Sequence, residues 1–412
     1  MDYEIVKLKE IADFNKESIG KNSNYEFINY LDTANITNGA IDTIIRIPIE
    51  EAPSRAKRIV HNNDIVYSTV RPNLCHYGIL DSTVENMIVS TGFTVISCKD
   101  DVNPYYVYNY LTQNGITSQL HSIAENSTSA YPSIKPSDLE NIEIKLPKLD
   151  IQNKIAKILT DIDKKIELNN EINNNLFELM KKTYVEWFKH FNIPNTSFEF
   201  KDSELGQIPI DWNIKHLKDV FFFQEGPGIR NWQYVDEDGT KFINIRCIKD
   251  RDLELDTANM ISNEEAQGKY KHFMLNEWDV VVSTSGTLGR SQIIRKEHLP
   301  LCLNTSVIRF KPINGFDEYA FMYNYLISDE FLNLLDVMAT GSAQRNFGPM
   351  HLKKIDLVYP SKDIINKFNN LIFPIIENIQ NNKAENMKLT QLRDALLPKL
   401  MNGEIDLDNI EI

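Results

Sequence analysis

Residues 150–192 read DIQNKIAKILTDIDKKIELNNEINNNLFELMKKTYVEWFKHFN. Apolar side chains recur in this stretch at alternating steps of four and three residues. On a helix such steps place the side chains in one narrow stripe, the a/d pattern of a coiled coil. The stripe consists of Ile151, Ile155, Ile158, Ile162, Lys165, Asn169, Ile172, Leu176, Leu179 and Thr183. We therefore expect a long helix that packs along this stripe against a second helix.

The same stripe returns 213 residues later, as Ile364, Phe368, Leu371, Ile375, Asn378, Asn382, Glu385, Leu389, Leu392 and Leu396. Both stripes are apolar at their ends and polar in the middle. Because polar positions fix the register and the partner of a coiled coil, each helix is expected to pair with the other. Such a rod of about 60 Å would separate two globular units. Pro374 predicts a kink in the second helix and Pro398 its end.

Composition limits the class of protein. The chain has 412 residues, enough for two or three domains, and no apolar run approaches the ~20 residues that span a membrane. The first residues, MDYEIVKLKE, lack the apolar core of a signal peptide, which predicts a cytoplasmic protein. The four cysteines are widely spaced, which argues against a zinc site and a disulfide framework. With a net charge of −14, any basic nucleic-acid footprint must be local.

The repeat extends beyond the helices. The segment Asp64–Thr69 (DIVYST) returns as Asp279–Thr284 (DVVVST), and Tyr108–Leu111 returns as Tyr323–Leu326. The β-branched runs predict strands at 44–49, 65–70, 93–96, 242–248, 280–283 and 306–310, and the aromatic runs predict short helices at 105–111 and 318–326. Strands and helices do not alternate regularly, which indicates an α+β fold. The predicted plan is a globule at 1–147, a helix at 148–192, a linker at 193–210, a globule at 211–360, a helix at 361–403 and a tail at 404–412.

Motifs of catalysis are incomplete in this sequence. Residues 103–106 (NPYY) resemble the Asn-Pro-Pro-aromatic loop of adenine-N6 methyltransferases, but the second proline and a glycine-rich cofactor loop are absent. Asp138, Glu143 and Lys145 have a nuclease-like spacing that the second repeat does not keep. The glycines of residues 286–290 (GTLGR) lack the lysine of a phosphate-binding loop. We therefore predict neither a catalytic site nor a metal site.

Polar and aromatic side chains on loops are the remaining candidates for contacts with base edges and phosphates. For each one alone, a solvated surface position is the simpler interpretation. Together they are more informative, because the strands of the two repeats agree while residues 70–73 (VRPN) and 285–288 (SGTL) differ. This pattern favours two readers of different sequences. The candidates are Arg55, Lys57, Arg58, Ser68, Thr69, Arg71, Asn73, Tyr77, Trp232, Tyr234, Arg246, Lys249, Lys269, Lys271, Ser285, Arg290, Gln344, Arg345 and Asn346.

Nearly the whole chain resembles the specificity subunits of Type I restriction–modification enzymes. The resemblance rests on the duplicated plan, on residues 64–72 and 278–290, and on the C-terminal segment 392–405 (LRDALLPKLMNGEI). It implies two α/β target recognition domains, separated by two long helices that form an antiparallel coiled coil with pseudo-two-fold symmetry. It also implies a non-catalytic subunit that reads a split DNA target. By resemblance, two methyltransferase subunits carry S-adenosylmethionine, and motor and nuclease subunits join the complex.

Two other functions are compatible with single features of the sequence. The loop at 103–106 would be the site of a self-contained DNA adenine-N6 methyltransferase. The two helices alone would suit a coiled-coil scaffold with no role on DNA.

The helices generate a first prediction. Deletion of seven residues from the polar middle of either helix should change or abolish the spacer length between the two halves of the DNA target. The physical reason is that a rod shortened by about 10 Å can no longer hold two readers at the same separation. Sequencing of methylated sites in cells that carry the deletion measures this; an unchanged spacer would contradict it.

Overall fold

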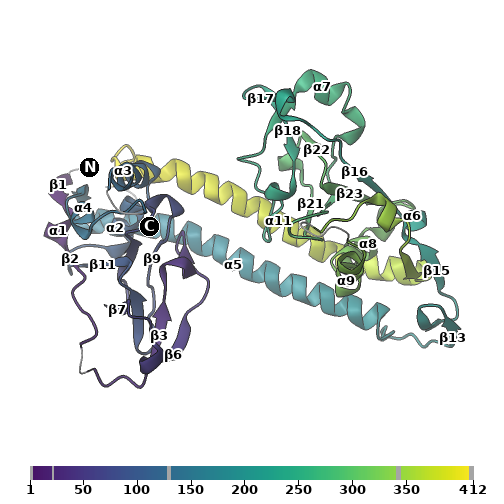
Figure 1. Ribbon diagram of the computed structural model, residues 1–412, viewed down its shortest axis with the longest axis horizontal. Helices are drawn as coiled ribbons and strands as arrows, with labels where there is room; N and C mark the ends of the chain where they lie inside the picture. Colours follow the sequence, from purple (N-terminus) through teal and green to yellow (C-terminus); the bar gives the residue numbers. More distant parts are fainter. Residues whose placement is uncertain (1–2, 21–22, 128–130, 340–344, 408–412) are drawn as a thin grey trace. The chain divides into compact units, whose positions relative to one another are not determined.

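The computed structural model describes residues 3–20, 23–127, 131–339 and 345–407 (Figure 1). The chain divides into two compact units, Met1–Ile166 with Lys388–Ile412, and Glu167–Met387. Each unit contains one globule and one part of each long helix, α5 (Leu149–Phe188) and α11 (Lys362–Met401).

The globule of the first unit contains two four-stranded sheets. One has the order β2 (Ala12–Phe14), β11 (Phe93–Cys98), β8 (Ile65–Ser68) and β9 (Tyr77–Ile79), and is antiparallel throughout. The other has the order β6 (Ile45–Pro48), β3 (Phe27–Leu31), β10 (Met87–Ser90) and β7 (Ala56–Ile59), with β3 and β10 parallel. Two short pairs complete it, β1 (Tyr3–Lys7) with β12 (Glu143–Pro147) and β4 (Ile36–Thr37) with β5 (Ala40–Ile41). Its helices are α1 (Leu8–Ile11), α2 (Pro104–Leu111), α3 (Asn114–Glu125) and α4 (Pro136–Glu140).

The globule of the second unit repeats this frame. Its first sheet has the order β16 (Phe221–Glu225), β23 (Val307–Pro312), β20 (Val280–Ser283) and β21 (Ser291–Ile293). Its second sheet has the order β17 (Tyr234–Val235), β19 (Met260–Ser262), β18 (Gly239–Ile243) and β22 (Leu301–Leu303), with β18 and β22 parallel. The short pair is β15 (Asn213–His216) with β24 (Asp356–Tyr359). Its helices are α6 (Leu217–Val220), α7 (Asn263–Gln267), α8 (Tyr319–Leu326), α9 (Asp329–Met338) and α10 (Pro349–Leu352).

The predicted α+β class and duplicated frame are confirmed. The all-antiparallel sheets correspond strand for strand, and each second sheet has one parallel pair. In the first unit this pair, β3 with β10, is central, because β10 also pairs with β7. In the second unit the parallel pair lies at the edge, because β22 has, besides β18, only an isolated bridge between Cys302 and Met274 among the described residues. The segment 193–210, which was expected to be a linker, contains the hairpin β13 (Phe200–Ser203) and β14 (Gly206–Pro209).

The aspartates of the repeated motif have a structural role. Asp64 and Asp279 are both buried at the start of equivalent strands, where each accepts a hydrogen bond from the backbone N–H three residues earlier, at 2.8 and 2.9 Å. Asp64 also accepts one from Ser97 at 2.6 Å, and Asp279 pairs with Lys311 at 3.0 Å. Burial raises the pKa of Asp64. A buried carboxylate requires such partners, which explains why the motif occurs twice.

Within each unit the segments of the two long helices pack antiparallel. In the second unit Phe188 and Phe368 have ring centroids 4.8 Å apart, and Asn382 donates to Asn173 at 2.8 Å. The polar middle of the stripe is thus paired within the second unit, where Asn169 donates to Glu385 at 2.7 Å. In the first unit Arg393 pairs with Asp163 at 2.9 Å, and the core contains Ile151, Ile155 and Leu159 with Leu400 and Met401.

The predicted stripe is wrong by one residue in parts of both helices. Ile151, Ile155, Ile364 and Phe368 are buried, and Ile158, Ile162, Leu176, Ile375, Leu389 and Leu396 are half-buried. Ile172, Leu179, Leu371 and Leu392 are instead exposed, by 37–52%. Their places are taken by neighbours such as Asn173, Met180, Ile372 and Arg393, of which the first three are buried and the last is half-buried.

The correction follows from the period of the helix. A strict 3.5-residue repeat stays on one face only if the helices supercoil, whereas a straight α-helix has 3.6 residues per turn and drifts about 20° per heptad. From Ile151 to Trp187 the inward positions advance by about 3.6 residues per step. Neither proline ends α11, which continues through Pro374 and Pro398 to Met401. Pro374 is exposed, as is Asn370, whose carbonyl loses its helical hydrogen bond.

This register generates a second prediction. Ile372→Ala should lower the free energy of unfolding of the second unit by about 2–5 kcal/mol, because it leaves a cavity in the core. The matched variant Leu371→Ala, at a half-exposed position, should cost only about 0.5 kcal/mol. Tryptophan fluorescence during urea unfolding reports on this unit alone, since all four tryptophans lie within residues 167–387. If the two variants lose equal free energy of unfolding, the corrected register is wrong and the strict heptad stripe is supported.

Candidate functional site

The candidate site in each unit is the connection between the third and fourth strands of the antiparallel sheet. We call residues 69–76 hairpin loop 1 and residues 284–290 hairpin loop 2. Each loop is closed by a backbone hydrogen bond of 2.9 Å, from Ser68 to His76 and from Ser283 to Arg290. A backbone bridge also joins each loop to a later segment. Val70 pairs with Ser133, just before α4, and Ser285 pairs with Asn346, just before α10. The two loops therefore share their closing hydrogen bond and their bridge, and they differ in length by one residue and in side chains.

In the first unit the predicted residues divide into exposed and structural ones. Arg55, Lys57, Arg71 and Asn73 are exposed and Arg58 is half-buried. Arg55 pairs with Asp32 at 2.9 Å, and Arg58 donates to the Ser18 hydroxyl at 3.3 Å.

Three residues predicted in the first unit are used by the fold itself. Ser68 is buried and donates to the Val70 carbonyl at 3.1 Å, and Thr69 donates to the Gly92 carbonyl at 3.0 Å. Tyr77 is buried, with its ring stacked 5.2 Å from that of Tyr67. Both Ser68 and Tyr77 are buried in this structure, which argues against the predicted DNA contacts of their side chains. Thr69 uses its hydroxyl to tie hairpin loop 1 to the turn between β10 and β11.

In the second unit Trp232 is the most exposed predicted aromatic residue, at 80%. Arg246, Lys249, Lys269 and Lys271 are exposed as well, whereas Tyr234 is half-buried with its ring 5.2 Å from that of Phe242. Ser285 is buried and its backbone forms an isolated bridge with Asn346, which argues against the predicted base contact of its side chain. Asn346 is exposed, and Gln344 lies outside the described residues.

The two predicted arginines of hairpin loop 2 and its bridging segment are paired with carboxylates. Arg290 contacts Asp250 at 2.7 Å and donates to the Ile248 carbonyl at 3.1 Å, with 26% of its side chain exposed. Arg345 pairs with Asp336 at 2.7 Å and is half-exposed. Each guanidinium must therefore break its ion pair with the carboxylate before it can bind a base or a phosphate.

Sequence reasoning missed a buried polar network that fixes the loop 249–253 in the second unit. Gln292 donates to the Lys249 carbonyl at 2.7 Å and accepts from Lys383 of α11 at 2.9 Å. Arg295 makes two hydrogen bonds to Asp252, at 2.8 and 2.7 Å. Burial lowers the pKa of Lys383 to about 8. Burial alone would raise the pKa of Asp252, but the hydrogen bonds from Arg295 lower it below its ordinary value. No spacing along the sequence indicates this network, because its members come from three separate segments.

The motifs of catalysis have structural roles in the first unit. Asn103 begins α2, where its side chain accepts from the Tyr106 N–H at 3.1 Å and donates to Asn153 of α5 at 2.7 Å. Asp138 accepts from the Lys135 N–H at 2.7 Å at the start of α4, and Lys145 donates to Asn402 at 3.4 Å. Among the described residues no group of three His, Cys, Asp or Glu side chains could bind a metal ion.

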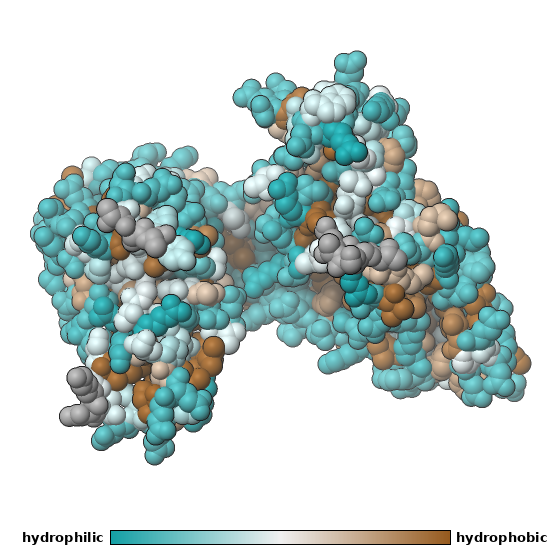
Figure 2. Space-filling model, viewed as in Figure 1, coloured by the Kyte–Doolittle hydropathy of each residue, from teal (hydrophilic) through white to brown (hydrophobic). Residues whose placement is uncertain are grey.

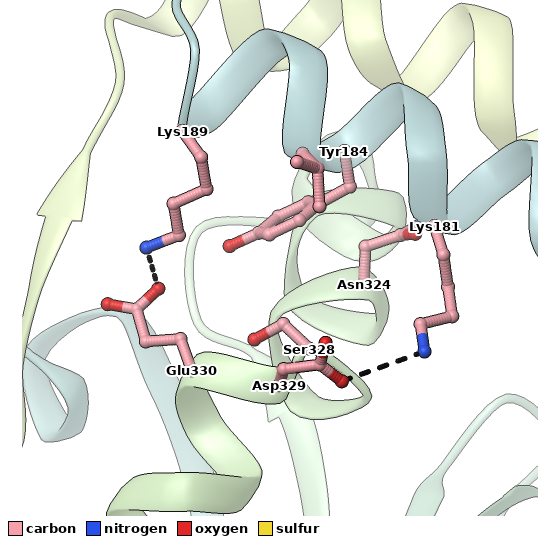
Figure 3. A pocket seen from close by; sticks show the side chains of 8 residues that line it. Lys181, Tyr184, Lys189, Asn324, Ser328, Asp329 and Glu330 are labelled. Carbon is pink, nitrogen blue, oxygen red and sulfur yellow. Dashed lines mark hydrogen bonds and ion pairs between the residues drawn. The ribbon is translucent and has the colours of Figure 1, made fainter.

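A pocket of about 190 Å³ lies in the second unit beside α5, where α8 and α9 meet (Figure 3). Lys181 pairs with Asp329 at 3.7 Å and Lys189 pairs with Glu330, and Figure 3 shows Tyr184 between the two ion pairs. None of the residues predicted to bind DNA lines it. The ion pairs instead join α5 to α9.

The face drawn in Figure 2 is mainly hydrophilic, with scattered hydrophobic patches. Within the described part of the chain, no helix is both long and apolar enough for a membrane span. Because the exposed loops are polar and the interior is apolar, the hairpin loops are the candidate surface for binding a polar ligand.

Comparison with known proteins assigns the family. A model of the Type I restriction modification DNA specificity domain matches residues 1–178 and 209–393, one match in each repeat. The chain belongs to the Type I restriction modification DNA specificity family. A curated member of this group, the specificity subunit of the Type I restriction enzyme HindI from Haemophilus influenzae, is 24% identical over 92% of this chain and 95% of its own. The MjaIX specificity subunit from Methanocaldococcus jannaschii is 26% identical over 79% of this chain and 74% of its own.

A solved structure supports the fold of the specificity family. The S subunit of a Type-I restriction-modification system from M. genitalium covers 97% of this chain and 96% of its own, with a TM-score of 0.58 and 15% identity. Because the identity is low, this similarity concerns the fold alone.

The buried network generates a third prediction. His298 lies buried with its Nδ1 accepting the Arg295 N–H at 3.1 Å, and burial lowers its pKa to about 4. In the unfolded chain this histidine binds a proton near pH 6.5, whereas in the folded chain it stays neutral down to about pH 4. The free energy of unfolding is therefore highest above pH 6.5 and falls by up to about 3 kcal/mol as the pH approaches 4.

The variant His298→Gln should flatten this dependence. Glutamine offers an acceptor that does not titrate, and Gln233 accepts the Arg230 N–H in an equivalent turn at 3.0 Å. Urea unfolding followed by tryptophan fluorescence, at pH 7.5 and pH 5, measures the difference between the two proteins. The prediction fails if both lose the same stability on acidification.

Proposed function

We propose that this chain is the DNA-reading subunit of a Type I restriction–modification enzyme, and that each globule reads one half of a split target. The observation that carries the proposal is the pair of hairpin loops: they connect corresponding strands and share a closing hydrogen bond and a bridge, while their side chains differ. Two equal frames with different loops suit two different half-sites. Membership of the specificity family agrees with this role.

The recognition chemistry follows from the exposed side chains. Arginine and asparagine can make paired hydrogen bonds to the major-groove edges of guanine and adenine, and each such pair discriminates by about 1–3 kcal/mol. Arg71 and Asn73 of hairpin loop 1, and Arg290 with Asn346 in the second unit, are the proposed base contacts. Lysines such as Lys57, Lys249, Lys269 and Lys271 are the proposed phosphate contacts, which position the protein without reading sequence.

The remaining functions belong to partner subunits in this proposal. Methyltransferase subunits dock on the two long helices and carry S-adenosylmethionine, and motor and nuclease subunits complete the restriction enzyme. The chain itself has no cofactor and no catalytic role, and it acts in the cytoplasm. Because the chain has a net charge of −14, the partner subunits must make a share of the phosphate contacts in this proposal. The use of Asn103 as a helix cap and tie to α5 favours this role over a self-contained methyltransferase.

A fourth prediction tests the proposal. Sequencing of methylated DNA should show a split motif that appears when this gene and its methyltransferase partner are expressed and disappears when this gene is deleted. Replacement of residues 1–147 by those of a related subunit should change one half of the motif and leave the other half intact. If no motif depends on the gene, the proposed function is wrong.

A control separates the rival functions. The purified chain alone, incubated with S-adenosylmethionine and target DNA, should transfer no methyl group; transfer would identify it as a methyltransferase. A complex with the methyltransferase that binds target and random DNA equally would instead indicate a scaffold.

A further inference from the structure

Hairpin loop 1 contains two non-glycine residues in a backbone region that favours glycine. Arg71 has a φ of 48° and Cys75 a φ of 54°. The equivalent positions of hairpin loop 2 are glycines, Gly286 with a φ of 69° and Gly289 with a φ of 78°. The fold therefore requires left-handed backbone at both positions, and glycine meets that requirement without steric cost.

Arginine is an unfavourable choice for this position. Besides its left-handed backbone, Arg71 precedes Pro72, and residues before proline favour extended backbone. Surrounding hydrogen bonds determine the conformation, from the Arg71 N–H to the Pro132 carbonyl and from the Leu74 N–H to the Arg71 carbonyl, both at 2.9 Å. Backbone strain of this kind is concentrated at functional sites, where a particular side chain is needed.

The side chain of Arg71 is available for such a function. Its guanidinium lies over the ring of Tyr131, 4.9 Å from the ring centroid, and both residues are exposed. Within the described residues no carboxylate or carbonyl oxygen contacts this guanidinium, whereas Arg55 and Arg290 are paired with aspartates. Stacking on an aromatic face orients a guanidinium and leaves its N–H groups free in the plane.

The neighbouring part of the loop also exposes apolar side chains. Val70 and Leu74 are 40% and 44% exposed, and Tyr131, under the guanidinium, is 59% exposed. An arginine with an oriented, unpaired donor pair matches the N7 and O6 acceptors of guanine in the major groove.

We propose that Arg71, oriented by Tyr131, reads a guanine in the half-site bound by the first globule, and that the left-handed backbone at this position is retained for that contact. The inference rests on the proposed function and specifies one of its base contacts. Hairpin loop 2 reads its half-site without an equivalent residue, because Gly286 has no side chain to present.

The test uses the chain in complex with its methyltransferase and a duplex carrying the motif found by sequencing of methylated DNA. Each guanine of the first half-site is replaced in turn by 7-deazaguanine, which lacks the N7 acceptor. For the wild-type complex, one replacement should weaken binding by about 2- to 12-fold, because it removes one of the two hydrogen bonds of the bidentate contact. For Arg71→Gly, binding to the unmodified duplex should fall by about 5- to 150-fold, because both hydrogen bonds are lost, and that replacement should have no further effect.

Two further measurements separate reading from folding. Arg71→Gly should raise the melting temperature, since it installs the residue that hairpin loop 2 uses. Cys75→Gly, at the other left-handed position, should keep the wild-type sensitivity to 7-deazaguanine. The inference is overturned if the first half-site has no guanine, or if Arg71→Gly remains as sensitive to every replacement as the wild type. In both cases the split motif, and with it the proposed function, would still hold; absence of any motif would be the failure of the proposed function itself.

Discussion

The contact between α5 and α11 determines how the second unit is built. Phe188 and Phe368 lie 4.8 Å apart by ring centroids, in one core with Trp187 and Phe321 of the globule. Large aromatic side chains contribute most of the buried area in such a core. Farther along the same segments the contact becomes polar, with Asn173 paired to Asn382. Since buried amides must be paired, only one register satisfies both the aromatic and the amide contacts.

The first unit meets the same constraint with different residues. Ile155 and Leu159 of α5 share a core with Leu400 and Met401 at the end of α11 and with the helices of the globule. A charged pair, Arg393 with Asp163 at 2.9 Å, lies beside this core. In each unit a globule is therefore packed onto two antiparallel helix segments, and its loops are positioned by the same elements that complete its core.

Within each globule, the side chains that build the frame and those available for recognition come from adjacent positions. Ser68 and Ser283 both donate from their hydroxyls to a carbonyl inside the hairpin loop, and Asp64 and Asp279 both accept from the turn that leads into the following strand. The loop residues beyond them are free to differ. Arg290 is held by Asp250 and by the Ile248 carbonyl, whereas Arg71 has an aromatic neighbour and, among the described residues, no carboxylate. The two loops thus offer different donors from equal frames.

Much of this architecture follows from the sequence, because repeats and periodicity are local properties. The two long helices, the short aromatic helices and most of the duplicated strands appear where the pattern predicts them. The strand predicted at 242–248 is wrong in its bounds, because β18 ends at Ile243 and Ile245–Cys247 form a 3₁₀ helix. The sequence alone did not determine which side of each helix is buried: Ile372 is buried and Leu371 exposed because a straight helix turns by 3.6 residues, not 3.5. Tertiary structure alone joined Lys383 to Gln292, since this contact links segments far apart in the chain. It also paired Arg290 with Asp250 and left Arg71, among the described residues, without a carboxylate, because pairing depends on the neighbours that folding brings together.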